Sequence, residues 1–272
     1  MSKIDARWLF LFLWIVVLAP FIVSISLPMK ISALTNQWYN YLNDMPDGSV
    51  VLWSWDVSFA GWSEMEASGV AVTKLLRKLM EERDFRIIMI GHRSECGPLP
   101  EIVLKDLGMH PDQTAEYGKK YCHLGYMAGG SVAMINFAKD IRSVMPVDWW
   151  GTPLDDLPVM DGINTIQDID LCIYIESGGT AAITQWVIPY GTKLMLCSVQ
   201  GNVPGQMPNL QAGLIKGMLG GLRGGAELEK LTGFLGVGNI NITAFSSAHL
   251  VIMAFIVLAN ITFFIRRARR EI

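Results

Sequence analysis

The sequence lacks the short motifs that identify the common classes of enzyme and metal site. Four cysteines occur among 272 residues, and no two have CxxC spacing, which argues against a zinc site. Walker loops, dinucleotide fingerprints and GxSxG nucleophile elbows are absent, and no second histidine is clearly placed to act as a base. Charged residues are 17% of the chain, and its net charge is −3. Because both ends of the chain are basic, the central region is acidic, and an acidic domain is unsuited to binding nucleic acid. We therefore predict no metal, no cofactor and no catalytic residue.

The few cysteines leave one pairing open. Cys172 and Cys197 lie in apolar, strand-like runs, where buried free thiols are common. Cys96 and Cys122 lie in or near loops, and an extracytoplasmic location would permit a disulfide between them. The sequence does not decide whether this bridge forms.

The chain does have a long apolar run near each end. Trp8 to Leu27 follows two basic residues, and His249 to Ile265 is followed by four arginines. Each run is close to the roughly 20 residues that cross a bilayer as a helix. A cleaved signal peptide is the alternative for the first run, and a buried core helix for the second. Because flanking basic residues tend to stay in the cytoplasm, we expect both termini there and the central domain outside it.

These runs divide the chain into three parts. We expect an N-terminal transmembrane anchor over residues 1–29 and an extracytoplasmic domain over residues 30–240. Residues 241–272 are expected to form the C-terminal transmembrane helix and a basic cytoplasmic tail. Asn260 is costly in lipid unless it faces a partner, so it hints at association between membrane helices.

Strand-like and helix-like segments alternate through the central region. The predicted strands are 49–56, 85–90, 119–125, 170–175 and 193–199, and the predicted helices are 64–82, 99–107, 131–144, 180–190 and 209–231. This alternation indicates βαβ units, and near-continuous apolar strands are typical of a sheet covered on both faces. We therefore predict an α/β fold with a doubly wound, mainly parallel sheet. Residues 148–169 break the alternation and are expected to form a long, ordered loop, a kind of segment that often carries function.

Polar residues follow several predicted strands, at the edge where open parallel sheets bind ligands. The segment from Ser177 to Thr180 could present free amides to an anion, or could simply form a turn with Thr180 as a helix cap. His92 could act as an acid or base, with a partner subunit or a loop cap as the alternative role. The candidate ligand-binding residues are Asp56, His92, Arg93, Ser177, Gly178, Gly179, Thr180 and Gln200.

Six glycines recur along the predicted helix 209–231. Their spacing places them on one helical face, and each costs about 0.5–1 kcal/mol relative to alanine. Close backbone contact would compensate, either with the domain's own sheet or with a neighbouring subunit. The candidate oligomer-interface residues are Gly213, Gly217, Gly220, Gly221 and Gly224.

Residues 125–130 (GYMAGG), 150–158 (WGTPLDDLP) and 213–227 (GLIKGMLGGLRGGAE) are similar to an uncharacterised prokaryotic family of membrane-anchored α/β proteins. The resemblance spans roughly residues 49–231. It implies an α/β domain next to a membrane anchor, and it implies no activity or catalytic residue.

Three functions remain open. The preferred hypothesis is a non-enzymatic scaffold subunit of an oligomeric membrane assembly, in contact with the lipid bilayer and with further copies or other membrane subunits. The alternative is a membrane-anchored receptor for a small polar or anionic ligand at the carboxyl edge of the sheet. The third is a hydrolase that uses His92 as an acid or base. The absence of a catalytic set favours a protein that is not an enzyme.

Overall fold

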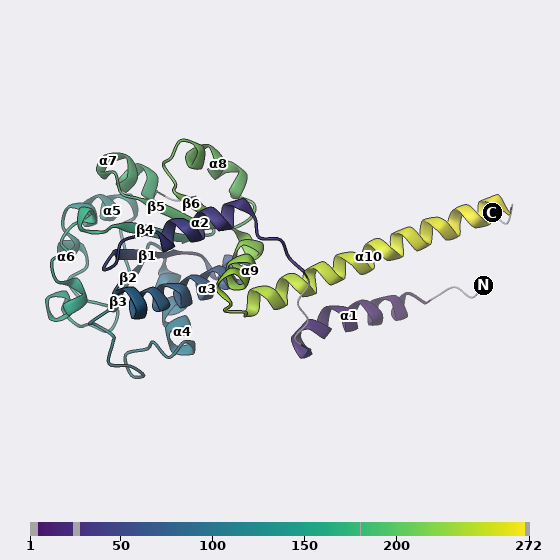
Figure 1. Cartoon of the computed structure of the whole chain (residues 1–272), viewed down its shortest axis with the longest axis horizontal. Helices are drawn as coiled ribbons and strands as arrows, with labels where there is room; N and C mark the ends of the chain where they lie inside the picture. The colour runs from purple at the N-terminus through teal and green to yellow at the C-terminus, as the bar shows by residue number, and fades with distance from the viewer. Residues whose placement is uncertain (1–4, 24–27, 180, 270–272) are drawn as a thin grey trace.

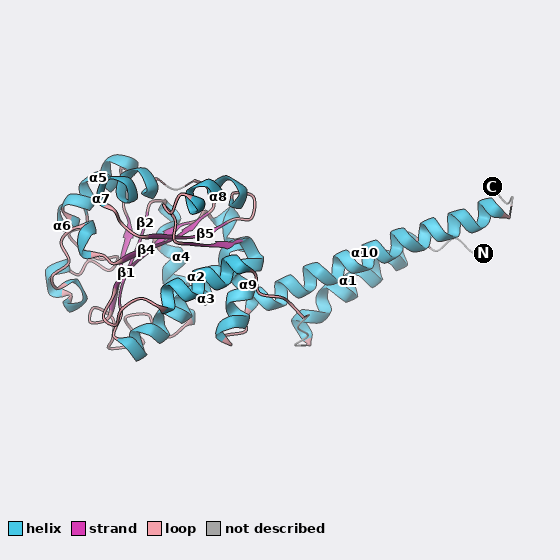
Figure 2. Ribbon diagram, turned by 45° about the horizontal axis from the view of Figure 1, so that its top comes forward, coloured by secondary structure: helices cyan, strands magenta, loops and turns pink. Residues whose placement is uncertain are grey.

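Six parallel strands form one sheet at the centre of the globular part of the computed structural model, which describes residues 5–23, 28–179 and 181–269 (Figures 1 and 2). The strands are β1 (Val50–Asp56), β2 (Arg86–Gly91), β3 (Tyr121–Tyr126), β4 (Leu171–Glu176), β5 (Leu194–Ser198) and β6 (Gly217–Gly220). Their order is β3-β2-β1-β4-β5-β6. The winding direction therefore reverses between β1 and β4, as in doubly wound sheets.

Two hydrophobic cores lie on the two faces of this sheet. The first contains residues of α2 (Ala33–Asn43), α3 (Phe59–Arg83), α4 (Pro98–Asp106) and α9 (Gly221–Thr232). The second contains residues of α5 (Gly130–Lys139), α6 (Ile141–Val144), α8 (Val203–Gln211) and a π-helical turn (Ile183–Val187) that continues into α7 (Ile188–Tyr190). Alternate side chains of β1 enter alternate cores, so Trp53 and Trp55 lie in the first and Leu52 lies in the second. The predicted parallel α/β architecture and its five strands are confirmed.

The predicted helix 209–231 is wrong, and the sixth strand lies inside it. α8 ends at Gln211, β6 follows, and α9 begins at Gly221. Gly213 and Gly221 have φ angles of +73° and +50°, which interrupt a right-handed helix. Gly217 lets α2 pack on β6, because a Cβ there would lie 2.8 Å from Cα of Trp38. The glycine spacing reflects a turn, a strand and a close contact instead of one helical face.

Residues 148–169 form an ordered structural segment. Asp148 is buried and accepts hydrogen bonds from the Tyr117 hydroxyl (2.7 Å) and from the backbone N–H of Thr152 (2.7 Å). Three 3-10 turns follow, at Leu154–Asp156, Pro158–Met160 and Ile166–Asp168. Their apolar side chains fill the second core, so this segment covers the sheet.

The disulfide considered between Cys96 and Cys122 does not form. All four cysteines are free and buried. Cys96 belongs to the first core and Cys122 to the second, so the sheet separates them. The Cys96 thiol instead donates to the carbonyl oxygen of Trp55.

One helix in the described part of the chain, α10 (Val237–Ala268), is long and apolar enough to cross a membrane. The N-terminal helix α1 (Ala6–Ile22) is apolar but has only 17 residues, and residues 24–27 of the predicted first span lie outside the described residues. The two helices pack side by side and antiparallel, with the rings of Phe12 and Phe255 6.1 Å apart. The start of α1 and the end of α10 therefore both lie away from the sheet (Figure 1).

The first turns of α10 belong to the domain. Glu229 of α9 is buried and accepts hydrogen bonds from the backbone N–H groups of Gly236 (3.1 Å), Gly238 (2.9 Å) and Asn239 (2.8 Å). A carboxylate at this position accepts hydrogen bonds from amides that would otherwise be unpaired. Its negative charge also interacts favourably with the positive end of the helix dipole. α10 is thereby fixed to the domain. Asn260, further along, donates to the carbonyl oxygen of Ile256 in its own helix (2.9 Å), so its amide is paired without a partner helix.

Candidate functional site

A row of polar side chains crosses the carboxyl edge of the sheet where the winding reverses. Asp56 ends β1 and is the register partner of Glu176, which ends β4. Glu176 is in turn the register partner of Ser198 at the end of β5, and the Ser198 hydroxyl donates to Glu176 Oε1 (2.9 Å). Register partners point to the same face of a sheet. Two carboxyl groups are thus brought side by side at the edge where doubly wound sheets bind ligands.

Both carboxyl groups hold their protons more tightly than usual. Burial raises the pKa of Glu176 to about 7; the Ser198 hydrogen bond opposes the increase, whereas the Asp56 charge adds to it. Burial raises the pKa of Asp56 to about 6, against the opposing effect of the Arg93 guanidinium. Glu176 is fully buried and Asp56 is half-buried. Ionising either carboxyl group at this buried edge is therefore unfavourable. A ligand that supplies positive charge or hydrogen-bond donors would stabilise the ionised groups.

His92, which follows β2, adds a neutral imidazole beside this row. Its ring stacks on Tyr174 (centroids 5.5 Å apart, planes at 16°) and meets Trp186 edge-on (5.5 Å). Burial lowers the pKa of His92 to about 4, so it is neutral at pH 7. Its two ring nitrogens are buried, and neither makes a hydrogen bond with any other residue that the structure describes. Tyr174 lies two positions before Glu176 on the same face of β4, so His92 lies next to the carboxyl row.

The loops after the strands are tied together above the row. Ser177 Oγ accepts a hydrogen bond from the Ser58 N–H (3.0 Å), and Ser58 caps α3. The Asn202 side chain donates to the Gly178 carbonyl oxygen (2.6 Å), which joins this loop to the start of α8. Gly178 and Gly179 are exposed, with open space around the position of a Cβ.

Most of the predicted ligand residues follow strands at one edge of the sheet. Asp56, His92 and Ser177 lie at the winding reversal, and the exposed Arg93 guanidinium acts on the Asp56 carboxyl group. Gln200 follows β5 at the same edge, and its backbone N–H donates to Glu64 Oε1 (2.6 Å) near the start of α9. Thr180 is outside the described residues.

The candidate residues chosen from the sequence did not include Glu176, Ser198, Tyr174 or Trp186. A usable signal existed for Glu176, which is a carboxylate at the end of the otherwise apolar run LCIYI. The partnership with Asp56 and Ser198 depends on strand order and register, which short motifs do not contain.

The serines do not form a nucleophile–base pair. Ser58 and Ser177 are engaged in the cap and loop contacts, and within residues 5–23, 28–179 and 181–269 no hydrogen bond joins either of them to His92. The same part of the chain holds no group of three or more His, Cys, Asp and Glu side chains that could bind a metal ion.

The candidate interface glycines mostly face inward. Gly217, Gly221 and Gly224 are buried in the chain's own contacts, and Gly220 is half-buried against Gln200 and Val203. Gly213 alone among the five is exposed, in the turn after α8. These positions do not present the continuous exposed stripe on which the interface prediction rested.

Comparison with protein-family models, curated proteins and solved structures gives no match. The resemblance in residues 125–130, 150–158 and 213–227 therefore stays a prediction.

Proposed function

We propose that this protein is a membrane-anchored domain that binds a small polar ligand through Asp56 and Glu176. The observation that supports it is the register pairing of two carboxyl groups, both with raised pKa, at the winding reversal of the sheet. Groups whose pKa is strongly perturbed beside a sheet edge are candidate functional residues.

The charge of this edge favours one ligand class. Two carboxyl groups lie side by side, and one exposed guanidinium, Arg93, acts on Asp56. An anion would add to the negative charge of this pair, whereas an ammonium or guanidinium group would compensate it and donate hydrogen bonds. Neutral His92 supplies a further donor or acceptor without adding charge. We therefore propose an amine, a guanidine or another ligand rich in donors, and not the anion that the sequence left open.

We further propose that α1 and α10 anchor the domain with both termini in the cytoplasm. Their antiparallel packing supports termini on one side of the membrane, and the arginines that end α10 support the cytoplasmic side. Protease added outside intact cells should then degrade residues 49–231. Protection of this region without permeabilisation would reverse the assignment.

The scaffold hypothesis loses one of its supports with the glycine helix, since three of its five proposed contact residues are buried within the chain. Oligomerisation stays a prediction that size measurement in detergent can check.

The ligand proposal is tested by thermal unfolding of the full-length protein with a defined panel. Amines and guanidines (ethanolamine, putrescine, agmatine, arginine) are compared with glucose and with phosphate, sulfate and ATP. Binding to the folded state raises the midpoint as ligand concentration rises. We expect stabilisation by at least one amine or guanidine and its loss in Asp56→Asn and Glu176→Gln. Asp156→Asn is the matched control, because Asp156 is exposed in a distant 3-10 turn. Stabilisation by anions alone, or an amine effect that survives both substitutions, would refute the proposal.

A further inference from the structure

A groove lies where α10 leaves the domain. It has a volume of about 460 Å³, and Leu222, Ile242 and Phe245 form its apolar surface. Arg223 and Glu64 also line it, so it carries one positive and one negative side chain. A second hollow of about 320 Å³ shares Arg223 and Ile242 with it.

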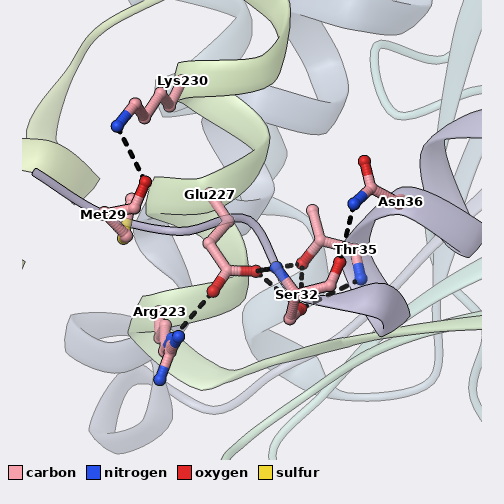
Figure 3. Close-up of polar contacts among 7 residues, drawn as sticks. All are labelled: Met29, Ser32, Thr35, Asn36, Arg223, Glu227 and Lys230. Carbon is pink, nitrogen blue, oxygen red and sulfur yellow. Dashed lines mark hydrogen bonds and ion pairs between the residues drawn. The ribbon is translucent and has the colours of Figure 1, made fainter.

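The buried carboxylate of Glu227 holds Arg223 in place (Figure 3). Arg223 Nε donates to Glu227 Oε1 (2.7 Å), while Glu227 Oε2 accepts hydrogen bonds from the hydroxyl groups of Ser32 (2.6 Å) and Thr35 (2.7 Å). These hydrogen bonds keep the pKa of Glu227 below its usual value despite the opposing effect of burial. The Arg223 side chain is 61% exposed, and its Nη1 and Nη2 make no hydrogen bond with the other described residues. A fixed guanidinium with a free edge matches the geometry of a phosphate group.

Glu64 supplies the opposite charge in the same groove. Its Oε1 accepts the Gln200 N–H (2.6 Å), which holds the carboxylate next to the start of α9. Its second oxygen remains available for a donor. An ammonium group can donate hydrogen bonds to that oxygen, whereas a quaternary choline group cannot.

The groove is continuous with the apolar surface of α10. Phe245 is 61% exposed, and the exposed apolar residues of α10 continue beyond it at Leu250, Ile252, Met253, Ile256, Val257, Leu258, Ile261, Phe263, Phe264 and Ile265. If this surface lies in lipid, the groove lies at the level of the headgroups, about one helical turn from the apolar run that begins at His249. An acyl chain leaving the groove could then follow α10 directly into the bilayer.

We propose that this groove binds a phosphatidylethanolamine molecule, with its phosphate on Arg223, its ammonium on Glu64 and an acyl chain against Ile242 and Phe245. The proposal rests on α10 being a membrane anchor and is independent of the Asp56–Glu176 ligand site. One positive and one negative side chain on the lining of an apolar groove match a zwitterionic headgroup better than an anionic one.

The test measures lipid that stays bound to the full-length protein. The protein is reconstituted in nanodiscs with equal amounts of phosphatidylethanolamine, phosphatidylglycerol and phosphatidylcholine, re-extracted in mild detergent, and examined by native mass spectrometry. We expect retained phosphatidylethanolamine, with at least tenfold less in Arg223→Gln. Glu64→Gln should remove the preference for phosphatidylethanolamine over phosphatidylglycerol.

Two further variants separate binding from folding. Arg77→Gln is the matched control, because Arg77 also forms an i,i+4 pair with a glutamate (2.8 Å) but does not line the groove. It should retain lipid like the wild type. Phe245→Ala leaves the Glu227 hydrogen bonds intact and should still reduce lipid retention. Retention of phosphatidylethanolamine at the wild-type level in both Arg223→Gln and Phe245→Ala, or a preference for phosphatidylglycerol in the wild type, would overturn the proposal.

Discussion

Glu176→Gln should stabilise the protein at alkaline pH. The folded state raises the Glu176 pKa from 4.5 to about 7, so between these values it binds more protons than the unfolded state. The contribution of Glu176 to stability therefore falls as pH rises through this window and is fully unfavourable above about pH 7. One pKa unit corresponds to about 1.4 kcal/mol, which places the cost near 3 kcal/mol. Glutamine removes the charge and can still accept the hydrogen bond from Ser198.

The assay is thermal unfolding of wild type and Glu176→Gln in detergent from pH 5 to pH 8. For a domain of this size about 1 kcal/mol shifts the midpoint by about 2–4 °C, so the variant should gain about 6–12 °C at pH 8 and little at pH 5. The difference between the two proteins is the quantity to compare, because His92 and His123 both have pKa values lowered to about 4 by burial and act in the opposite direction. A difference that does not change with pH, or a variant less stable at pH 8, would refute the reasoning.

The remaining predictions concern the membrane junction, the glycines and the cysteines. Glu229→Ala leaves the amides at the start of α10 without a partner and should lower the free energy of unfolding by about 2–4 kcal/mol. Hydrogen exchange of these amides should become faster, and unchanged exchange would contradict the capping role. Gly225→Ala places a Cβ 2.6 Å from the Ser68 nitrogen and should cost about 1–3 kcal/mol in denaturant unfolding without changing oligomeric size. Gly201→Ala, which meets nothing within 4 Å, is its control. The four cysteines should react with maleimide only after unfolding, and a mass change on reduction would reveal a disulfide instead.

Periodicity and local composition were enough to predict the sheet. Apolar runs such as residues 49–56 and 170–175 alternate with helical segments, and the structure places five strands at the predicted ranges with shifts of one or two residues. Strands buried on both faces have a distinctive composition, so this part of the fold is encoded locally.

The sixth strand could not be found in the same way. β6 is four residues long and contains two glycines, and its neighbours 213 and 221 suggest helical spacing. Its identity as a strand depends on pairing with β5 and on contact with Trp38, almost two hundred residues away in sequence. Tertiary contacts of this kind override local spacing.

Only part of the candidate site could be predicted from the sequence, again because tertiary contacts decide which residues meet. The rule that ligands bind at the carboxyl ends of parallel strands selected Asp56, His92 and Ser177, which the structure brings to the winding reversal. The rule cannot say which strands become neighbours, so it could not show that Glu176 would be the partner of Asp56 and Ser198. Strand order determined which side chains meet.

The central claim is that Asp56 and Glu176 together bind a donor ligand, and proton-linked calorimetry tests it most directly. The amine or guanidine that stabilises the protein most in the ligand panel is titrated at pH 6.5 in two buffers of different ionisation enthalpy. A cation favours the ionised carboxyl groups, so binding should release protons, and Glu176→Gln should reduce that release. Binding that releases no protons, or binding that is unchanged when Asp56→Asn and Glu176→Gln are combined, would contradict the account.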